Sequence, residues 1–231
     1  MTAGEIWDVL IVWTPYLAGG FGWNIIVSLA AMAIGTPVGL VLAMLREGQR
    51  PSMQQSGGML TTLARNVPTF VMLFYLAYVI PTEFELFGQE MVFPAWLKAS
   101  LALGIAVAGY VSDNALAAIR HLRRHEVAEA LLFLPAWTGY FLIIAMASST
   151  ASVIGVPELV HRSETVIGAI GNVDVVLWVY LYAMLWFFVF GAIVSLAMRL
   201  MSSRLRARGH GAAVVEPAAP GGAGQPLGSQ Q

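Results

Sequence analysis

Residues 175–198 read VVLWVYLYAMLWFFVFGAIVSLAM and contain no charged side chain. A helix that crosses the hydrocarbon core of a bilayer needs about 20 mostly apolar residues, so this stretch predicts a membrane-spanning helix. The whole chain agrees with that prediction, because 58% of its residues are hydrophobic and only 11% are charged. Soluble domains carry about 25% charged residues. The surroundings expected for most of the chain are therefore lipid.

Four other stretches are long and apolar enough to span a membrane, namely residues 22–45, 60–80, 93–119 and 127–150. The predicted fold class is therefore all-α, a polytopic membrane helical bundle of about five transmembrane helices. Polar or charged residues separate these stretches, which predicts loops at 46–58 and 81–92 and a loop with a short helix at 155–174.

The chain divides into three parts by composition. Residues 1–18 contain Trp7 and Trp13 and predict an interfacial segment at the lipid headgroups, with a weakly ordered N-terminus as the alternative. Residues 19–200 form the predicted transmembrane domain. Residues 201–231 are first basic and then rich in Gly, Ala, Pro and Gln, which predicts a disordered tail. No cleavable signal peptide is expected, because the first twenty residues contain no Lys or Arg.

Positive charges predict the orientation. Five spans put the two ends on opposite sides, and Lys and Arg accumulate in cytoplasmic loops. With the N-terminus outside and the C-terminus in the cytoplasm, only Lys98 and Arg162 fall outside, and Arg65 lies within a span. The other arginines near span ends then all face inward: Arg46, Arg50, Arg120, Arg123, Arg124, Arg199, Arg204, Arg206 and Arg208.

Among the charged residues within the predicted spans, Arg65 and Asp113 stand out, because a charge inside a span costs about 2.5–3.5 kcal/mol on insertion scales. Arg65 precedes Pro68, and broken helices of this kind often line polar pathways in transporters. The alternative is that Arg65 snorkels to the inner headgroups. Asp113 lies between Ser112 and Asn114, where hydrogen bonding between helices is favoured over a role in a pathway.

Small and hydroxyl-bearing residues are further candidates for helix packing or solute binding. Ser148, Ser149 and Thr150 lie in the segment ASSTAS (147–152), which indicates either close helix packing or hydrogen bonds to a polar solute. The glycines at 35, 39, 104 and 109 are interpreted as close-packing positions.

The sequence argues against several chemistries. It contains no cysteine, its four histidines lack ligand spacing, and no G-x-x-x-x-G-K-[ST] loop is present. We therefore expect no metal, no cofactor in this chain and no catalytic residue. The net charge of −1 implies no nucleic-acid partner.

Four stretches of the chain resemble the permease subunits of polar amino acid ABC importers, the histidine/glutamine permease type. In residues 19–47, Gly35, Gly39 and Arg46 hold the family's positions. Arg65, Pro68 and Pro81 do so in residues 63–81, and Tyr110 with Asp113 in place of Glu in residues 108–119. The most specific stretch is ASSTASVIGVPELV (147–160), where Ser149, Ser152, Val153, Ile154, Gly155, Glu158 and Leu159 match.

The chain departs from the family's pattern in the cytoplasmic loop. The family's Glu-Ala-Ala motif with a following Gly forms a coupling helix that docks on an ATPase. Here the interval is shorter, and its only candidate is EVAEALLFL (126–134), without the Gly. Met146 and Ala147 replace a Lys-Asp pair, and Leu116 replaces an Arg.

The resemblance implies a type I ABC importer permease fold in a bacterial inner membrane, and import of a small polar solute, an amino acid. The implied partners are a second permease subunit, cytoplasmic ATPase subunits that bind ATP, and a periplasmic or lipid-anchored solute-binding protein. The implied pathway residues are Arg65, Pro68, Asp113, Ser148, Ser149 and Thr150. The implied coupling residues are Arg120, Arg123, Arg124, Glu126 and Glu129, and Glu158 would face the binding protein.

Two alternatives remain open from the sequence. The shortened loop motivates a degenerate permease with a structural or regulatory role and no ATPase coupling. The other alternative is an unrelated membrane protein with five spans, against which the SVIGVPEL stretch (152–159) argues.

Overall fold

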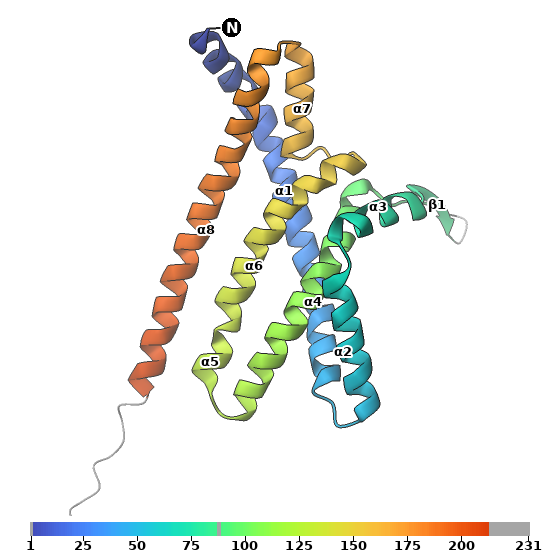
Figure 1. The fold of residues 1–231 in the computed structure, drawn as a ribbon, viewed down its shortest axis with the longest axis vertical. Helices are drawn as coiled ribbons and strands as arrows, with labels where there is room; N and C mark the ends of the chain where they lie inside the picture. The colour runs from blue at the N-terminus through green and yellow to red at the C-terminus, as the bar shows by residue number, and fades with distance from the viewer. Residues whose placement is uncertain (1, 87–88, 213–231) are drawn as a thin grey trace, which may run out of the picture.

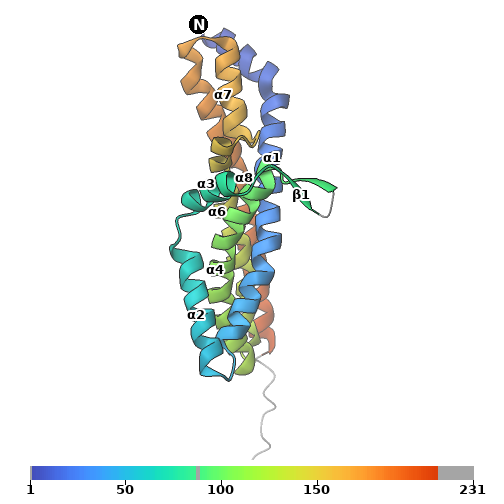
Figure 2. The same cartoon turned by 90° about the vertical axis from the view of Figure 1, so that its right-hand side faces the viewer.

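The computed structural model describes residues 2–86 and 89–212, which form a bundle of long helices along one axis (Figure 1). The N-terminus lies at one end of the bundle, and helix α8 ends at the other. The bundle is broad in Figure 1 and narrow in Figure 2. The helices are α1 (Ala3–Arg46), α2 (Pro51–Asn66), α3 (Thr69–Val79), α4 (Ala95–Arg123), α5 (Val127–Leu131), α6 (Phe133–Ala147), α7 (Leu159–Ile170) and α8 (Val176–Ala212), with short 3₁₀ helices η1 (Ser148–Ile154) and η2 (Val173–Val175).

Helix α1 is longer than the first predicted span. It begins at a capping box, in which Thr2 accepts the backbone N–H of Glu5 and the Glu5 carboxylate accepts that of Thr2. Its 44 residues reach about 66 Å at 1.5 Å per residue, which exceeds the hydrocarbon core of about 30 Å. The boundary expected at residue 18 is therefore not marked by a break, and residues 3–18 continue directly into the span.

The stretch predicted as a span at 60–80 is broken. Val67 has an extended conformation before Pro68, as expected when a proline ring crowds the preceding residue, and α2 and α3 meet at 92°. Four helical segments are long and apolar enough to cross a membrane, and there are five if this bent pair is one span. The loop predicted at 46–58 is also too long, because Pro51 starts α2, and proline suits the first position of a helix.

A β-hairpin follows α3 where the sequence predicted only a loop. Strands β1 (Glu83–Leu86) and β2 (Gln89–Val92) pair antiparallel, with Glu83 opposite Val92. Buried Lys98 of α4 ties this region to the bundle. Its Nζ donates to the carbonyl oxygen of Ile80 at 2.6 Å and lies 3.4 Å from that of Ala77, at the negative end of α3.

Helices α1 and α4 pack closely along the lower half of the molecule in Figure 1. The contact depends on glycines, as the sequence predicted. A Cβ built at Gly39 would lie 2.6 Å from the Cβ of Val111 and 2.7 Å from the carbonyl oxygen of Ala108. A Cβ at Gly35 would likewise collide with the backbone of Gly104. Small residues therefore bring the two backbones together.

Helix α7 attaches to the upper half of α1, and the loop with a short helix predicted at 155–174 is confirmed. Arg162 covers Gly19 and Gly20 of α1, donates to the carbonyl oxygen of Tyr16 at 2.7 Å, and lies 4.7 Å from the Tyr16 ring centroid. Helix α8 then returns along the bundle. It runs to Ala212, so the predicted tail begins as helix, and residues 213–231 lie outside the described chain.

Candidate functional site

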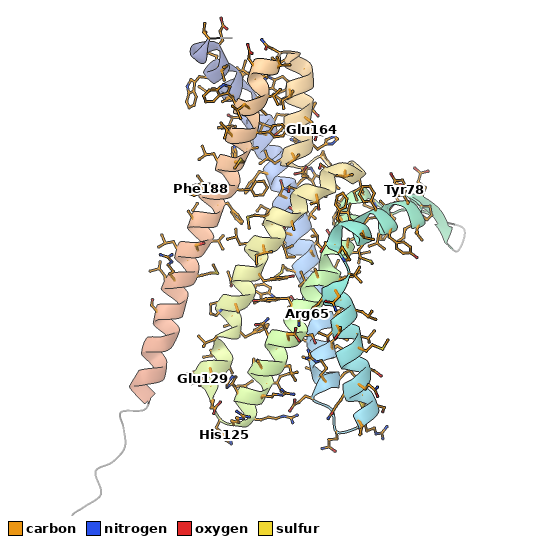
Figure 3. The ribbon with its side chains drawn as sticks, viewed as in Figure 1. Arg65, Tyr78, His125, Glu129, Glu164 and Phe188 are labelled. Atoms are coloured by element: carbon orange, nitrogen blue, oxygen red, sulfur yellow. The ribbon has the colours of Figure 1, made fainter. Side chains whose placement is uncertain are left out.

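The break between α2 and α3 places Arg65 beside Asp113 of α4. Arg65 lies in the last turn of α2, and its Nη1 donates to Asp113 Oδ2 at 2.6 Å. Its side chain is 60% exposed, and Pro68 occupies the N-cap position of α3 just beyond it. Arg65 and Asp113, the two charges that stood out within predicted spans, are thus brought together, and Figure 3 shows Arg65 beside α4 in the half of the bundle away from the N-terminus.

A second arginine, which sequence reasoning did not place in the site, shares the same carboxylate. Arg46, at the end of α1, donates to Asp113 Oδ1 at 2.6 Å and to Ser112 Oγ at 3.1 Å. Ser112 also hydrogen bonds to Thr61 of α2 at 2.8 Å. The polar group at 112–113 therefore joins α1, α2 and α4, which confirms the predicted hydrogen bonding between helices.

A cavity of about 360 Å³ opens beside this ion pair. Its floor includes the stacked rings of Tyr110 and Tyr140, with centroids 3.7 Å apart. Each phenol donates to a backbone carbonyl, Tyr110 to Ala136 at 3.0 Å and Tyr140 to Ala106 at 3.3 Å. The lining residues are Arg65, Ala106, Tyr110, Asp113, Asn114 and Tyr140.

The cavity presents both signs of charge. Asp113 accepts from two guanidinium groups, so the local group of two arginines and one carboxylate has a net charge of +1. Arg65 uses one nitrogen for Asp113, and a guanidinium has five N–H donors. Asn114 donates through its amide nitrogen to the Tyr110 carbonyl at 2.9 Å, which leaves its oxygen to accept. The cavity therefore offers donors, acceptors and an aromatic face.

The hydroxyl segment lies outside this cavity. Ser149 and Thr150 each bond back to a carbonyl three residues earlier, at Met146 and Ala147. Ser148 is buried and accepts a hydrogen bond from Asn24 Nδ2 of α1 at 3.0 Å. The expectation that these three residues share a cavity with Arg65 and Asp113 is therefore not met within the described chain.

Glu158 does not face outward, which corrects its expected contact with a binding protein. Its side chain is fully buried and caps α7 by accepting the backbone N–H groups of Val160 and His161, each at 2.9 Å. It also accepts from Asn24 Nδ2 at 3.0 Å. Burial raises the pKa of Glu158, and these hydrogen bonds oppose that shift.

The residues predicted to couple to an ATPase lie at the end of the bundle opposite the N-terminus, where Figure 3 marks His125 and Glu129. Arg120 and Arg123 both bind Glu47, at 3.1 and 3.0 Å. His121 pairs with Glu126 at 2.7 Å. Arg124 is the C-cap residue that follows α4, and Glu129 lies in the five-residue helix α5.

The sequence analysis did not predict three of the residues that hold these hydrogen-bond networks together. Asn24 and Lys98 are lone polar groups at the ends of predicted spans, and that position was the available signal. Arg46 was interpreted as an inward-facing charge and as a position shared with the family, not as a partner of Asp113. Among the described residues, no group of three or more acidic or histidine side chains could hold a metal ion.

Comparisons with known proteins find that the sequence is similar to those of transport proteins. A probable amino-acid ABC transporter permease protein of Bacillus subtilis is 25% identical over 174 residues, covering 67% of this chain and 74% of that protein. A probable amino-acid ABC transporter permease protein of Sinorhizobium fredii is 29% identical over 58% of this chain and 56% of its own length. A probable amino-acid permease protein of Bacillus subtilis is 27% identical over 49% of each. The chain thus spans about half the length of the last two.

A solved structure shares the fold. A chain of the crystal structure of an amino acid ABC transporter with histidines superposes with a TM-score of 0.72, covering 84% of this chain and 96% of that one at 20% identity. No family model matches the sequence. The all-α membrane fold and the resemblance to amino acid ABC permeases, both inferred from the sequence, are therefore confirmed.

Proposed function

We propose that this chain is a permease subunit of an ABC importer and that it moves a small polar solute, an amino acid, into the cytoplasm. One observation carries the proposal: the chain breaks a membrane helix at Val67–Pro68 and lines the break with Arg65 and Asp113. Transporters commonly build solute sites where a helix is discontinuous near the bilayer midplane. The similarity to amino-acid ABC transporter permeases supports the same reading.

The chemistry of the cavity suits a zwitterion. The guanidinium N–H groups of Arg65 that Asp113 does not use would bind a carboxylate. Asp113 and the side-chain oxygen of Asn114 would accept from an ammonium group. An α-amino acid carries both groups within a few bonds. The stacked tyrosines would contact its aliphatic part.

The distribution of arginine supports an orientation with the N-terminus outside and the C-terminus in the cytoplasm of a bacterial inner membrane. Arg46, Arg120 and Arg123 gather at the end opposite the N-terminus. ATPase subunits would dock at this end, on Arg124, Glu126 and Glu129. A second permease subunit and a periplasmic or lipid-anchored binding protein would complete the importer, and ATP would bind only to the ATPase.

The five residues of α5 are short for a coupling helix, so loss of ATPase coupling is the competing proposal. Affinity purification of the tagged chain from gently solubilised membranes separates the two. Recovery of an ATPase in stoichiometric amount supports the importer. Recovery of membrane partners without an ATPase refutes it and favours a structural or regulatory subunit.

Uptake tests the cavity. Arg65→Ala in the reconstituted importer should abolish amino acid uptake while the complex still assembles. The carboxylate of the transported amino acid would then have lost the guanidinium that binds it. Arg199→Ala is the matched control, since Arg199 is an exposed arginine on α8 that does not line the cavity. Normal uptake by the Arg65 variant would remove this cavity from the pathway.

A further inference from the structure

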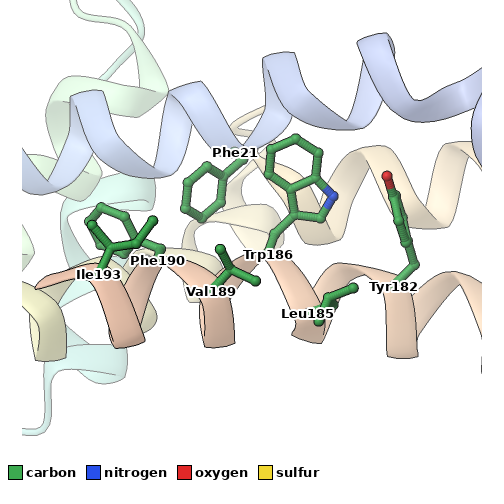
Figure 4. A pocket seen from close by; sticks show the side chains of 7 residues that line it. All are labelled: Phe21, Tyr182, Leu185, Trp186, Val189, Phe190 and Ile193. Carbon is green, nitrogen blue, oxygen red and sulfur yellow. The ribbon is translucent and has the colours of Figure 1, made fainter. Parts of the chain in front are cut away.

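A groove runs between α1 and α8, in the half of the bundle where the N-terminus lies. Two cavities of about 360 and 330 Å³ lie end to end along α8, and they share Tyr182 and Leu185 as walls. Figure 4 shows the first, where Phe21 of α1 faces the side chains of α8. Its remaining walls are Trp186, Val189, Phe190 and Ile193.

The lining of this groove, which we call the α1–α8 groove, excludes a polar ligand. Its only hydroxyl is that of Tyr182, which already hydrogen bonds to Thr14 of α1 at 2.9 Å. The indole of Trp186 is the one other polar side chain in the first cavity, and its ring packs on Phe21 with centroids 5.7 Å apart. A ligand of this groove therefore binds through apolar contact.

We infer that the α1–α8 groove is a binding site for one acyl chain of a phospholipid with an ammonium headgroup. The groove follows α8 from Trp178 to Ile193, which at 1.5 Å per residue is about 22 Å. Half of a hydrocarbon core of about 30 Å is about 15 Å, so the groove can hold a chain from the headgroup to the bilayer midplane. A concave wall of rings gives one chain more dispersion contact than a flat helix face does.

The charges at the outer end select the headgroup. Trp7 and Trp178 line the groove there and are 61% and 46% exposed, as expected of aromatic side chains at a membrane interface. Asp8 follows Trp7 on α1, and Asp174 precedes α8. Residues 2–18 and 171–198 contain no Lys or Arg. Arg162 of α7 is the arginine that contacts α1 near this end, where it lies over the Tyr16 ring, and it lines neither cavity. The acids beside the groove therefore attract an ammonium group and repel an anionic headgroup, independently of whether the chain transports a solute.

Native mass spectrometry of the purified complex tests the site after exchange into vesicles of equal parts phosphatidylethanolamine and phosphatidylglycerol. We expect one phosphatidylethanolamine to remain on each chain. Val189→Trp fills the groove and should reduce that occupancy about tenfold. Met184→Trp is the control, because Met184 is exposed on α8 and does not line either cavity. Asp8→Asn should lower the preference for phosphatidylethanolamine several-fold while a lipid still binds.

Equal lipid retention in the Val189 and Met184 variants would overturn the site. Preference for phosphatidylglycerol in the unmodified protein would overturn the assignment of the headgroup. If Val189→Trp instead dissociates a second copy of the chain or another membrane subunit, then a protein helix occupies the groove and the proposal is wrong.

Discussion

Helices α4 and α8 are both long and apolar enough to cross a membrane, but the protein buries them very differently. In the most apolar part of each helix, 56% of α4 is buried inside the bundle and 6% of α8. The buried face of α4 carries small and polar residues such as Ala99, Gly104 and Ser112, whereas α8 exposes large side chains such as Met184 and Phe188. Lipid is as apolar as leucine, so burial within a membrane protein follows close packing and hydrogen bonding rather than apolar content.

The largest expected effect breaks the polar junction on α4. Asp113→Ala leaves Arg46 and Arg65 without their shared carboxylate. Because Asp113 is 31% exposed, the free energy of unfolding should fall by about 2–3 kcal/mol, below the range for a fully buried pair. Chemical denaturation of the purified protein measures this change.

Glu164→Ala is the control for that experiment, because Glu164 is an exposed acid on α7 (Figure 3). A loss below about 0.5 kcal/mol in the Asp113 variant, the size of an ordinary surface change, would show that the junction does not stabilise the bundle.

The next effect tests the close approach of α1 to α4. Gly39→Ala should destabilise the protein by about 1–3 kcal/mol, because the new methyl group overlaps Val111 and the backbone of Ala108. Gly22→Ala in the same helix has nothing within 4 Å of its new methyl group. It should stabilise the protein by up to about 1 kcal/mol through helix propensity. The same sign for both variants in thermal unfolding would contradict the proposed packing.

A smaller effect concerns the buried carboxylate between α1 and α7. Burial raises the pKa of Glu158 in the folded protein, so the folded state binds the proton more tightly than the unfolded state does. The stability from this group is therefore full below its ordinary pKa of 4.5 and is lost as pH rises through the raised pKa.

Glu158→Gln keeps the shape of the neutral form and should remove that loss. Thermal midpoints measured from acid to neutral pH should show the unmodified protein falling relative to the variant. Parallel profiles of the two proteins would refute the burial effect.

The smallest effect belongs to α8. Phe188 is 73% exposed, and Figure 3 shows it pointing away from the bundle. Phe188→Leu should change the free energy of unfolding by less than about 0.5 kcal/mol, since the exposed side chain loses little protein contact. A loss above about 1 kcal/mol would mean that a protein partner covers this face of α8, and would remove the contrast with α4.

Much of the fold could be predicted, because spanning helices need only length and apolar composition. The spans at 22–45, 93–119 and 175–198 correspond to α1, α4 and α8, with starts that differ by at most two residues for α4 and α8. The stretch at 60–80 was harder, because Pro68 predicts a break but not the 92° angle between its two halves. The hairpin at 83–92 follows from chain pairing that no apolar pattern signals.

The candidate site could be predicted in part. Arg65 and Asp113 were recognised because charge is costly in lipid, and the structure pairs them. Glu158 was expected to face outward, because an acid in an outer loop is usually exposed, but its side chain is buried and caps a helix against Asn24. Ser148 was expected beside Arg65 and Asp113, but it hydrogen bonds to Asn24 of α1. The sequence alone does not indicate which helix a hydroxyl group will contact.

The sequence by itself determined that this chain is a helical membrane protein, which residues are costly in lipid, and where glycine allows close contact. These properties are local, because each depends on the transfer of one segment or one side chain from water to lipid. Only the tertiary structure decided which charges share a carboxylate, that α8 stays at the edge, and that a groove forms beside it. Those outcomes depend on contacts between helices distant in sequence, which composition cannot encode.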